Sequence, residues 1–194
     1  MLWLCVAHAK EIPGLRDLQT EGFQIQELGV GQFKSLATFS ALATKEKPTR
    51  VLLAGSCGSQ NRDDLLKIFS CNHFAYPSIA GEELPEFMPR SCATTPAVAA
   101  QNFAAATVVQ NHGISLSAEK FADNTGYIPP EYPRQLVENM EAASLAFFCH
   151  DHGIAFSALL CVTNTIGPEG RGEWRSNFRE AGLRLKAAVQ ELAR

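Results

Sequence analysis

Hydrophobic residues gather in short runs that alternate with longer segments of helical composition. Short apolar runs of the kind that form buried strands occupy residues 2–7, 51–54, 107–109 and 155–162. Segments with helical composition cover residues 31–44, 133–152 and 177–193, and Gly153 is placed to end the second of them. This order predicts an α/β fold in which a mixed, largely parallel central sheet is flanked by helices.

Two segments show no clear periodicity in their hydrophobic residues. Residues 61–95 contain Pro77, Pro85 and Pro89 among mixed polar residues, which predicts a loop with short strands. Residues 123–133 are dense in turn formers and predict an ordered loop whose Tyr127 and Tyr132 can cover a pocket. Because no repeat or linker divides the chain, we expect a single domain over residues 1–194.

Composition and charge exclude some classes of function. The chain has 194 residues, of which 46% are hydrophobic and 19% charged, so it can bury a substantial core. Its formal net charge is -3 and no basic stripe with interleaved aromatics is present, which argues against a nucleic-acid partner. No apolar run is long enough to cross a membrane, and the apolar start lacks a basic lead-in. We therefore expect no membrane partner and a cytoplasmic location.

The cysteines are expected to be free thiols in a reducing compartment, because their spacing shows no close pairing. They stand at positions 5, 57, 71, 92, 149 and 161. The sequence at 149–152, Cys-His-Asp-His, matches no structural zinc pattern. Its His150 and His152 are explained better by the negative end of a helix dipole. We expect neither a metal ion nor another cofactor.

An acidic residue lies inside an otherwise apolar, helix-like run at 137–149. Glu141 would sit beside Met140 and Leu145 on or near a core-facing stripe, where an unpaired charge is costly. A ligand rich in hydroxyl groups would supply the missing donors. The alternative is a helix whose Glu138 and Glu141 face water, which would be the better interpretation of these two glutamates taken alone.

Polar groups follow the predicted strands where ligands bind in open α/β sheets, beyond the carboxyl ends. Glu11 follows the first strand, the Gly-Ser-Cys-Gly turn at 55–58 follows the second, and Thr163 with Asn164 follows the last. Each feature alone is common in turns. Together with Glu141 they predict a ligand site.

In this order the motifs resemble the nucleoside phosphorylase and nucleosidase superfamily over nearly the whole chain. The matching segments are 7–11, 29–31, 51–58, 117–122, 138–142 and 162–164. The sequence Asn-Met-Glu at 139–141, followed by Asn-Thr-Ile-Gly at 164–167 and then Trp174, is most similar to the futalosine hydrolase branch. The chain is shorter than usual for the family, and the region after Gly58 is condensed.

The resemblance implies a purine nucleoside N-glycosidase without a cofactor, which releases hypoxanthine from futalosine through attack by water. Glu11 and Asn164 take the positions of catalytic residues. The residues implied to bind the substrate are Ser56, Cys57, Gly58, Phe121, Ala122, Asn139, Met140 and Glu141. Family members are often homodimers or larger oligomers, in which a neighbouring subunit completes the active site.

The chemistry of these residues fits that reaction. Cleavage passes through an oxocarbenium-like sugar, so the enzyme must anchor the ribose, stabilise the leaving base and orient a nucleophile. Glu141 can accept hydrogen bonds from both ribose hydroxyls, and Glu11 can activate water. The Asn164 amide can donate to purine N7 or O6 but cannot supply a proton. This favours hypoxanthine over adenine, although asparagine can also pair with adenine.

Hydrolysis is favoured over phosphorolysis. Bacterial purine nucleoside phosphorylases with the same Gly-Ser-Cys-Gly loop carry an arginine for phosphate three residues before the serine, where this chain has Leu53. Phosphorolysis stays open because Arg50, Arg62 or Arg90 could approach the site. Further alternatives are a methylthioadenosine or adenosylhomocysteine nucleosidase, a catalytically silent nucleoside-binding module, and a structural domain without a ligand.

Overall fold

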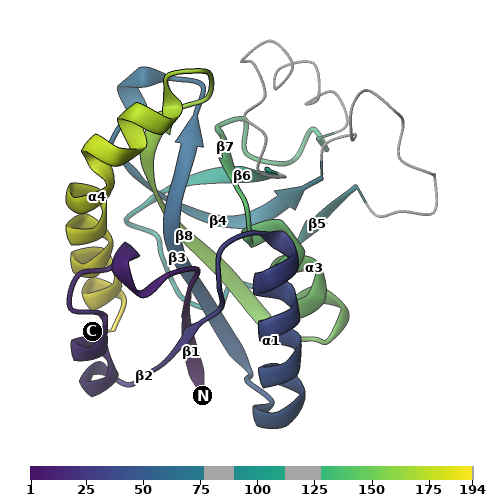
Figure 1. The fold of residues 1–194 in the computed structure, drawn as a ribbon. Helices are drawn as coiled ribbons and strands as arrows, with labels where there is room; N and C mark the ends of the chain where they lie inside the picture. Colours follow the sequence, from purple (N-terminus) through teal and green to yellow (C-terminus); the bar gives the residue numbers. More distant parts are fainter. Residues whose placement is uncertain (77–89, 112–127, 194) are drawn as a thin grey trace.

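The computed structural model describes residues 1–76, 90–111 and 128–193 (Figure 1). The strands are β1 (Leu2–Val6), β2 (Phe23–Glu27), β3 (Arg50–Ser59), β4 (Ile68–Ala75), β5 (Ser91–Ala93), β6 (Ala104–Gln110), β7 (Leu136–Asn139) and β8 (Ala155–Thr165). The α-helices are α1 (Gln32–Glu46), α3 (Ala142–Asp151) and α4 (Gly170–Leu192). Short 3₁₀ helices cover Ala9–Glu11, Leu15–Glu21 and Arg62–Asp64.

Strand pairing closes part of the described sheet into a ring. β3 pairs with β8, β8 with β4, β4 with β6, β6 with β7, and β7 with the last residues of β3. β1 and β2 extend the sheet from β3 in parallel, and β5 adds to β4 in the antiparallel sense. The β3–β7, β4–β5 and β4–β8 pairs are antiparallel and the others parallel, so the sheet is mixed.

Helices flank the sheet on two sides (Figure 1). On one side α1 and α3 share a buried cluster, in which Phe39 packs edge-on against Trp3 and Phe148. On the other side α4 buries Leu185 and Val189 among apolar residues of β1 and β8. Their four-residue spacing is the reason why one face of α4 is apolar. The α/β fold with a mixed, helix-flanked sheet is therefore confirmed.

The segment expected to be one helix over residues 133–152 is divided in the structure. Leu136–Asn139 forms β7, and α3 begins only at Ala142. The extended conformation is favoured because β7 pairs with both β6 and β3, which a helix could not do. The helix ends where we expected, since Gly153 adopts a left-handed conformation with φ of 66° directly after the capping residue.

Two strands extend further than we predicted. β3 continues to Ser59 and β8 to Thr165, so the sequence at 55–58 and the pair Thr163 and Asn164 lie inside strands, not after them. Their turn-forming residues stay extended because the two strands pair with each other in parallel, with a bulge between Cys57 and Gly58.

Other elements also differ from the expectation. Residues 61–95 contain the long strand β4, α4 starts at Gly170 rather than at residue 177, and β2 was not predicted. Tyr132 is buried against His73, with ring centroids 4.5 Å apart, and so packs in the core instead of covering a pocket. Tyr127 lies outside the described residues.

All six cysteines are free and buried, as expected. Within the described ranges, no helix combines the length and the apolar character that spanning a bilayer requires.

One glycine of α4 lets the helix approach the turn that carries Glu11. A Cβ atom on Gly182 would overlap the backbone oxygen of Glu11 and lie 2.8 Å from Cδ of Pro13. We expect Gly182→Ala to lower the free energy of unfolding by about 1–3 kcal/mol, because the turn must shift. Gly172→Ala is the matched control, since no atom lies within 4 Å there, and it should stabilise the helix by up to about 1 kcal/mol. Denaturant unfolding of both variants tests this, and equal effects would contradict it.

Candidate active site

A cavity of about 610 Å³ lies at the carboxyl ends of β1 and β3. Every predicted site residue that the structure describes lines it: Glu11, Ser56, Cys57, Gly58, Asn139, Met140, Glu141 and Asn164. The predicted Phe121 and Ala122 lie outside the described residues. The volume is in the range of small-molecule sites. The fold therefore brings together side chains that are up to 153 positions apart in the chain, from Glu11 to Asn164.

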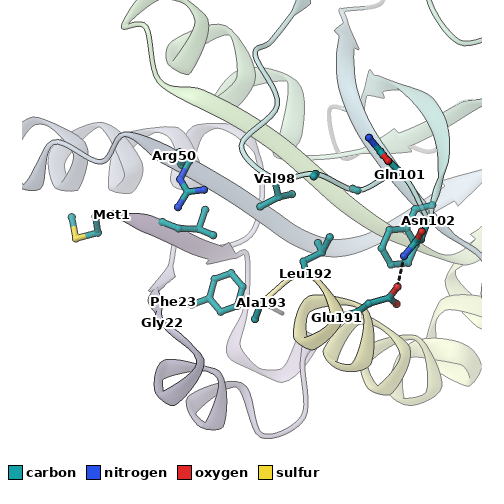
Figure 2. A pocket seen from close by; sticks show the side chains of 14 residues that line it. Met1, Gly22, Phe23, Arg50, Val98, Gln101, Asn102, Glu191, Leu192 and Ala193 are labelled. Atoms are coloured by element: carbon teal, nitrogen blue, oxygen red, sulfur yellow. Dashed lines mark hydrogen bonds between the residues drawn. The ribbon is translucent and has the colours of Figure 1, made fainter.

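A second cavity, of about 680 Å³, lies at the opposite end of β3 (Figure 2). It contains none of the predicted residues, and the carboxylate of Glu191 is engaged there by the Asn102 amide at 2.6 Å. Arg50 lines this second cavity. Arg50 is therefore placed away from the cavity that contains Glu11.

The Glu11 carboxyl group is held against β3 by its own turn. One oxygen accepts from the backbone N–H groups of Ala7 at 3.0 Å and His8 at 3.2 Å. The other lies 3.4 Å from both the backbone nitrogen and the hydroxyl of Ser56. Burial raises the pKa of Glu11, and these hydrogen bonds partly oppose the rise. Gly55 permits the contact, because a Cβ atom there would lie 3.3 Å from the carboxylate oxygen.

Glu141 is buried as predicted, but it precedes α3 instead of lying on a helical stripe. Its carboxylate accepts the backbone N–H of Gly31 at 2.7 Å, across 110 residues of sequence. Gly31 has a φ of 89°, which a residue with a side chain rarely adopts. Burial raises the pKa of Glu141 to about 7; the Gly31 N–H opposes the rise, and the charge of Glu11 adds to it. The charge of Glu11 thus acts on Glu141 across the cavity.

Asn139 connects β3 to the start of α3. Its amide oxygen accepts from the backbone N–H groups of Glu141 at 2.9 Å and Ala142 at 2.7 Å, which satisfies the helix terminus. Its amide nitrogen donates to the carbonyl of Ser56 at 3.0 Å. One buried side chain therefore fixes the position of Glu141 relative to the strand that faces Glu11.

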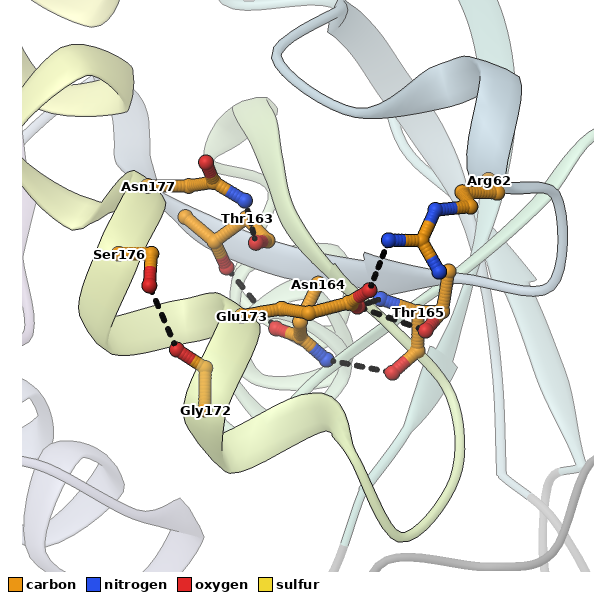
Figure 3. Close-up of polar contacts among 8 residues, drawn as sticks. All are labelled: Arg62, Thr163, Asn164, Thr165, Gly172, Glu173, Ser176 and Asn177. Atoms are coloured by element: carbon orange, nitrogen blue, oxygen red, sulfur yellow. Dashed lines mark hydrogen bonds and ion pairs between the residues drawn. The ribbon is translucent and has the colours of Figure 1, made fainter.

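The Asn164 amide is oriented by its neighbours (Figure 3). Its oxygen accepts from the Thr163 hydroxyl at 2.9 Å, and its nitrogen donates to the carbonyl of Thr165 at 3.1 Å. Thr165 is held in turn by Glu173, which accepts from its N–H and its hydroxyl, both at 2.7 Å. Arg62 lies 3.4 Å from the other oxygen of Glu173, so its charge is engaged in this network. The second N–H of the amide can donate towards a ligand.

Glu138 also lines the cavity, although we did not predict it as a site residue from the sequence. Gly58 pairs with Glu138 on one neighbouring strand and with Asn164 on the other. Glu138 is 7% exposed, and burial raises its pKa to about 7, although a hydrogen bond with Asn111 opposes the rise. Recognising a strand at 136–139 would have indicated Glu138 as a site residue. The helical composition of the surrounding residues favoured a helix instead.

Trp174 and Phe178 of α4 provide an apolar wall of the cavity, with ring centroids 4.7 Å apart. The indole nitrogen of Trp174 donates to the Ser56 hydroxyl at 3.4 Å. Lys10 and Arg171 also line the cavity. The site thus combines carboxyl groups, one oriented amide, aromatic rings and two cations, a set of groups suited to a ligand with sugar hydroxyls and a flat base.

Residues 88–194 match the family model of the phosphorylase superfamily, and the chain belongs to this superfamily. No curated protein gives a significant match.

Solved structures share the fold at low sequence identity. A 5′-methylthioadenosine/S-adenosylhomocysteine nucleosidase from Helicobacter pylori has a TM-score of 0.80 and 15% identity, covering 98% of both chains. Futalosine hydrolase from the same organism has a TM-score of 0.79 and 15% identity, covering 98% of this chain and 97% of the other. An adenine complex of the first type of nucleosidase, from Colwellia psychrerythraea, has a TM-score of 0.78 and 15% identity, covering 99% of this chain and 93% of the other. These likenesses show the fold.

The buried acid at position 138 predicts a pH-dependent stability. Unfolded Glu138 ionises near 4.5, whereas the folded carboxyl group stays protonated up to about 7, so stability is lost as pH rises through this window. We expect the free energy of unfolding of Glu138→Gln to rise relative to that of the wild type when the pH is raised from 5 to 8. The relative rise should be on the order of 3 kcal/mol. Denaturant unfolding at both pH values measures this gain. Glu180→Gln, at an exposed ion pair with Arg184, is the control and should leave the pH dependence unchanged. A gain independent of pH would contradict the prediction.

Proposed function

We propose that this protein is a purine nucleosidase that hydrolyses the N-glycosidic bond of futalosine and releases hypoxanthine. The observation that carries the proposal is the convergence of Glu11, Glu141 and Asn164 on one cavity of nucleoside size. Membership of the phosphorylase superfamily and the fold shared with nucleosidases support it.

Glu11 acts as the general base in this proposal. Its carboxyl group lies beside Ser56, and burial raises its pKa, which makes the carboxylate a stronger base. It takes a proton from a water molecule as the water oxygen attacks the ribose C1′ atom. The hydrogen bonds from Ala7 and His8 keep the acceptor in one orientation.

Glu141 binds the ribose. One of its oxygens is occupied by Gly31, and the carboxylate retains the capacity to accept from the sugar hydroxyls. These donors replace the water that burial has removed, so the ligand lowers the pKa that burial raised. Met140 forms an apolar surface beside the sugar.

The base lies between Asn164 and the backbone at Cys57 and Gly58. The remaining N–H of the oriented amide donates to an acceptor of a 6-oxopurine, which favours hypoxanthine. Lys10 and Arg171, which line the cavity, pair with an anionic group on the 5′ substituent of the ribose. Futalosine and adenosylhomocysteine carry a carboxylate there, whereas methylthioadenosine is neutral.

The positions of Leu53, Arg50 and Arg62 support water as the nucleophile. Leu53 is 2% exposed in the core, Arg50 lines the other cavity, and Arg62 is paired with Glu173. The Glu11 carboxylate lines the cavity and would repel a phosphate dianion. The second candidate is a methylthioadenosine or adenosylhomocysteine nucleosidase, because Asn164 can also pair with adenine.

The proposed function is tested by incubating the protein with futalosine, methylthioadenosine, adenosylhomocysteine and inosine, with and without phosphate, and measuring the free base. We expect hypoxanthine from futalosine at the same rate with and without phosphate. Strict phosphate dependence would identify a phosphorylase, and preferential release of adenine would identify the second candidate. Saturable binding without release would identify a silent binding module, and neither binding nor release a structural domain.

Glu11→Gln is expected to reduce kcat by about 10²- to 10⁴-fold, because the amide cannot accept the proton of water. Affinity for the free base should change little, since the side chain keeps its size. Glu27→Gln is the matched control. Glu27 on β2 accepts from the N–H of Ala9, which lies in the same turn as Glu11, at 3.1 Å, but Glu27 does not line the cavity. Steady-state kinetics and calorimetry measure both effects, and normal turnover by Glu11→Gln would exclude this role.

Glu141→Gln is expected to weaken nucleoside binding about 10- to 100-fold, which corresponds to the loss of charged hydrogen bonds to the ribose. Binding of free hypoxanthine should stay nearly unchanged. The glutamine can still accept the Gly31 N–H, so the fold around α1 is retained. Calorimetric titration with nucleoside and with free base separates these effects. Equal losses for both ligands would show that Glu141 has only a structural role.

A further inference from the structure

Glu138 and Asn164 face the same space from opposite sides of Gly58. These residues stand next to one another on β7, β3 and β8, because Gly58 is in register with both partners. A Cβ atom on Gly58 would lie 3.0 Å from a carboxyl oxygen of Glu138 and 3.0 Å from the amide nitrogen of Asn164. The absence of a side chain at Gly58 therefore lets a carboxyl group and an amide come close together on the wall of the cavity, where the proposed function places the purine.

The proposed reaction leaves one requirement unmet at this position. As the bond from ribose C1′ to the purine breaks, negative charge develops on the base. Asn164 can donate a hydrogen bond to the base but has no acidic proton to transfer. A carboxylic acid can transfer one, provided that it is still protonated near neutral pH.

The surroundings of Glu138 keep its carboxyl group protonated. The side chain is buried and hydrogen-bonded to the neutral Asn111, and within the described part of the chain it forms no ion pair. Several ionisable groups around it are acidic: Cys57 on β3 interacts electrostatically with Glu138, and Glu141 and Glu11 line the same cavity.

The cations of the cavity belong to other elements. Lys10 lies in the turn that contains Glu11, and Arg171 lies in the first turn of α4. Neither forms a salt bridge with Glu138. Burial is accordingly the largest cause of the raised pKa of Glu138.

We propose that Glu138 is the general acid that protonates the departing purine, a role that rests on the proposed nucleosidase function. The bond between ribose C1′ and the purine nitrogen breaks, and its electron pair stays on the base. The proton of the Glu138 carboxylic acid moves to a ring nitrogen of the base. The water oxygen bonds to C1′, and the proton of the water passes to Glu11. Exchange with solvent then removes the proton from Glu11 and restores that of Glu138.

The test compares futalosine with its N7-methyl derivative, whose base already carries a positive charge and leaves without a proton. Glu138→Gln should reduce kcat/KM for futalosine by about 10²- to 10⁴-fold and that for the methylated substrate by less than about 10-fold. The wild-type rate on futalosine should fall as pH rises above about 7, where the acid ionises, and this fall should be absent with the methylated substrate. Glu180→Gln on the exposed face of α4 is the control for the substitution itself.

The outcomes separate the two proposals. If the wild type releases base from none of the nucleosides, both the nucleosidase function and the role of Glu138 are overturned. If the wild type hydrolyses futalosine but Glu138→Gln affects both substrates equally, or neither, only the role of Glu138 is overturned. The pH dependence of the wild-type rate on the two substrates also tests the role of Glu138, and it does so without the variant. A fall in rate that is identical for both substrates would contradict an acid that acts on the leaving group.

Discussion

The pairing of the carboxyl end of β3 with two different strands is the constraint on which the site depends. β8 pairs with β3 in parallel along its length and continues to pair beyond a bulge at which the register shifts, while β7 joins the last residues of β3 from the other side. Polar residues that would form a turn in isolation are thereby kept extended in the sheet. This arrangement places Ser56 beside Glu11, and it places Gly58 between the side chains of β7 and β8.

Such a site costs free energy when it is empty. Raising the pKa of a buried glutamate from 4.5 to about 7 corresponds to about 3 kcal/mol at alkaline pH, and this applies to both Glu138 and Glu141. A domain of ordinary stability has about 5–15 kcal/mol in total. A sequence under selection for stability alone would replace these carboxyl groups by neutral ones, so their burial is best explained by a ligand that compensates the cost.

The sequence allowed the fold class and most of the described candidate site to be predicted, because the buried strands contain continuous apolar runs and the polar residues come directly after these runs. It failed where the conformation depends on partners distant in sequence. Leu136–Asn139 lies within a segment of helical composition, and only its pairing with β3 and β6 makes it a strand. For the same reason Glu138 was missed: its neighbours Gly58 and Asn164 come from other strands. Glu141 was predicted to be buried, yet the donor that holds it is a backbone N–H at Gly31, which no local pattern reveals.

Helix α4 contacts both halves of the cavity. Its first turns carry Glu173 and Trp174, which hold Thr165 and contact Ser56, and more than two turns later Gly182 packs on the backbone of Glu11. A continuous helix is stiff, with a rise of about 1.5 Å per residue. It therefore fixes the distance between the strand end that carries Asn164 and the turn that carries Glu11. A kink in α4 between Trp174 and Gly182 would change this distance and so move Glu11 relative to Asn164.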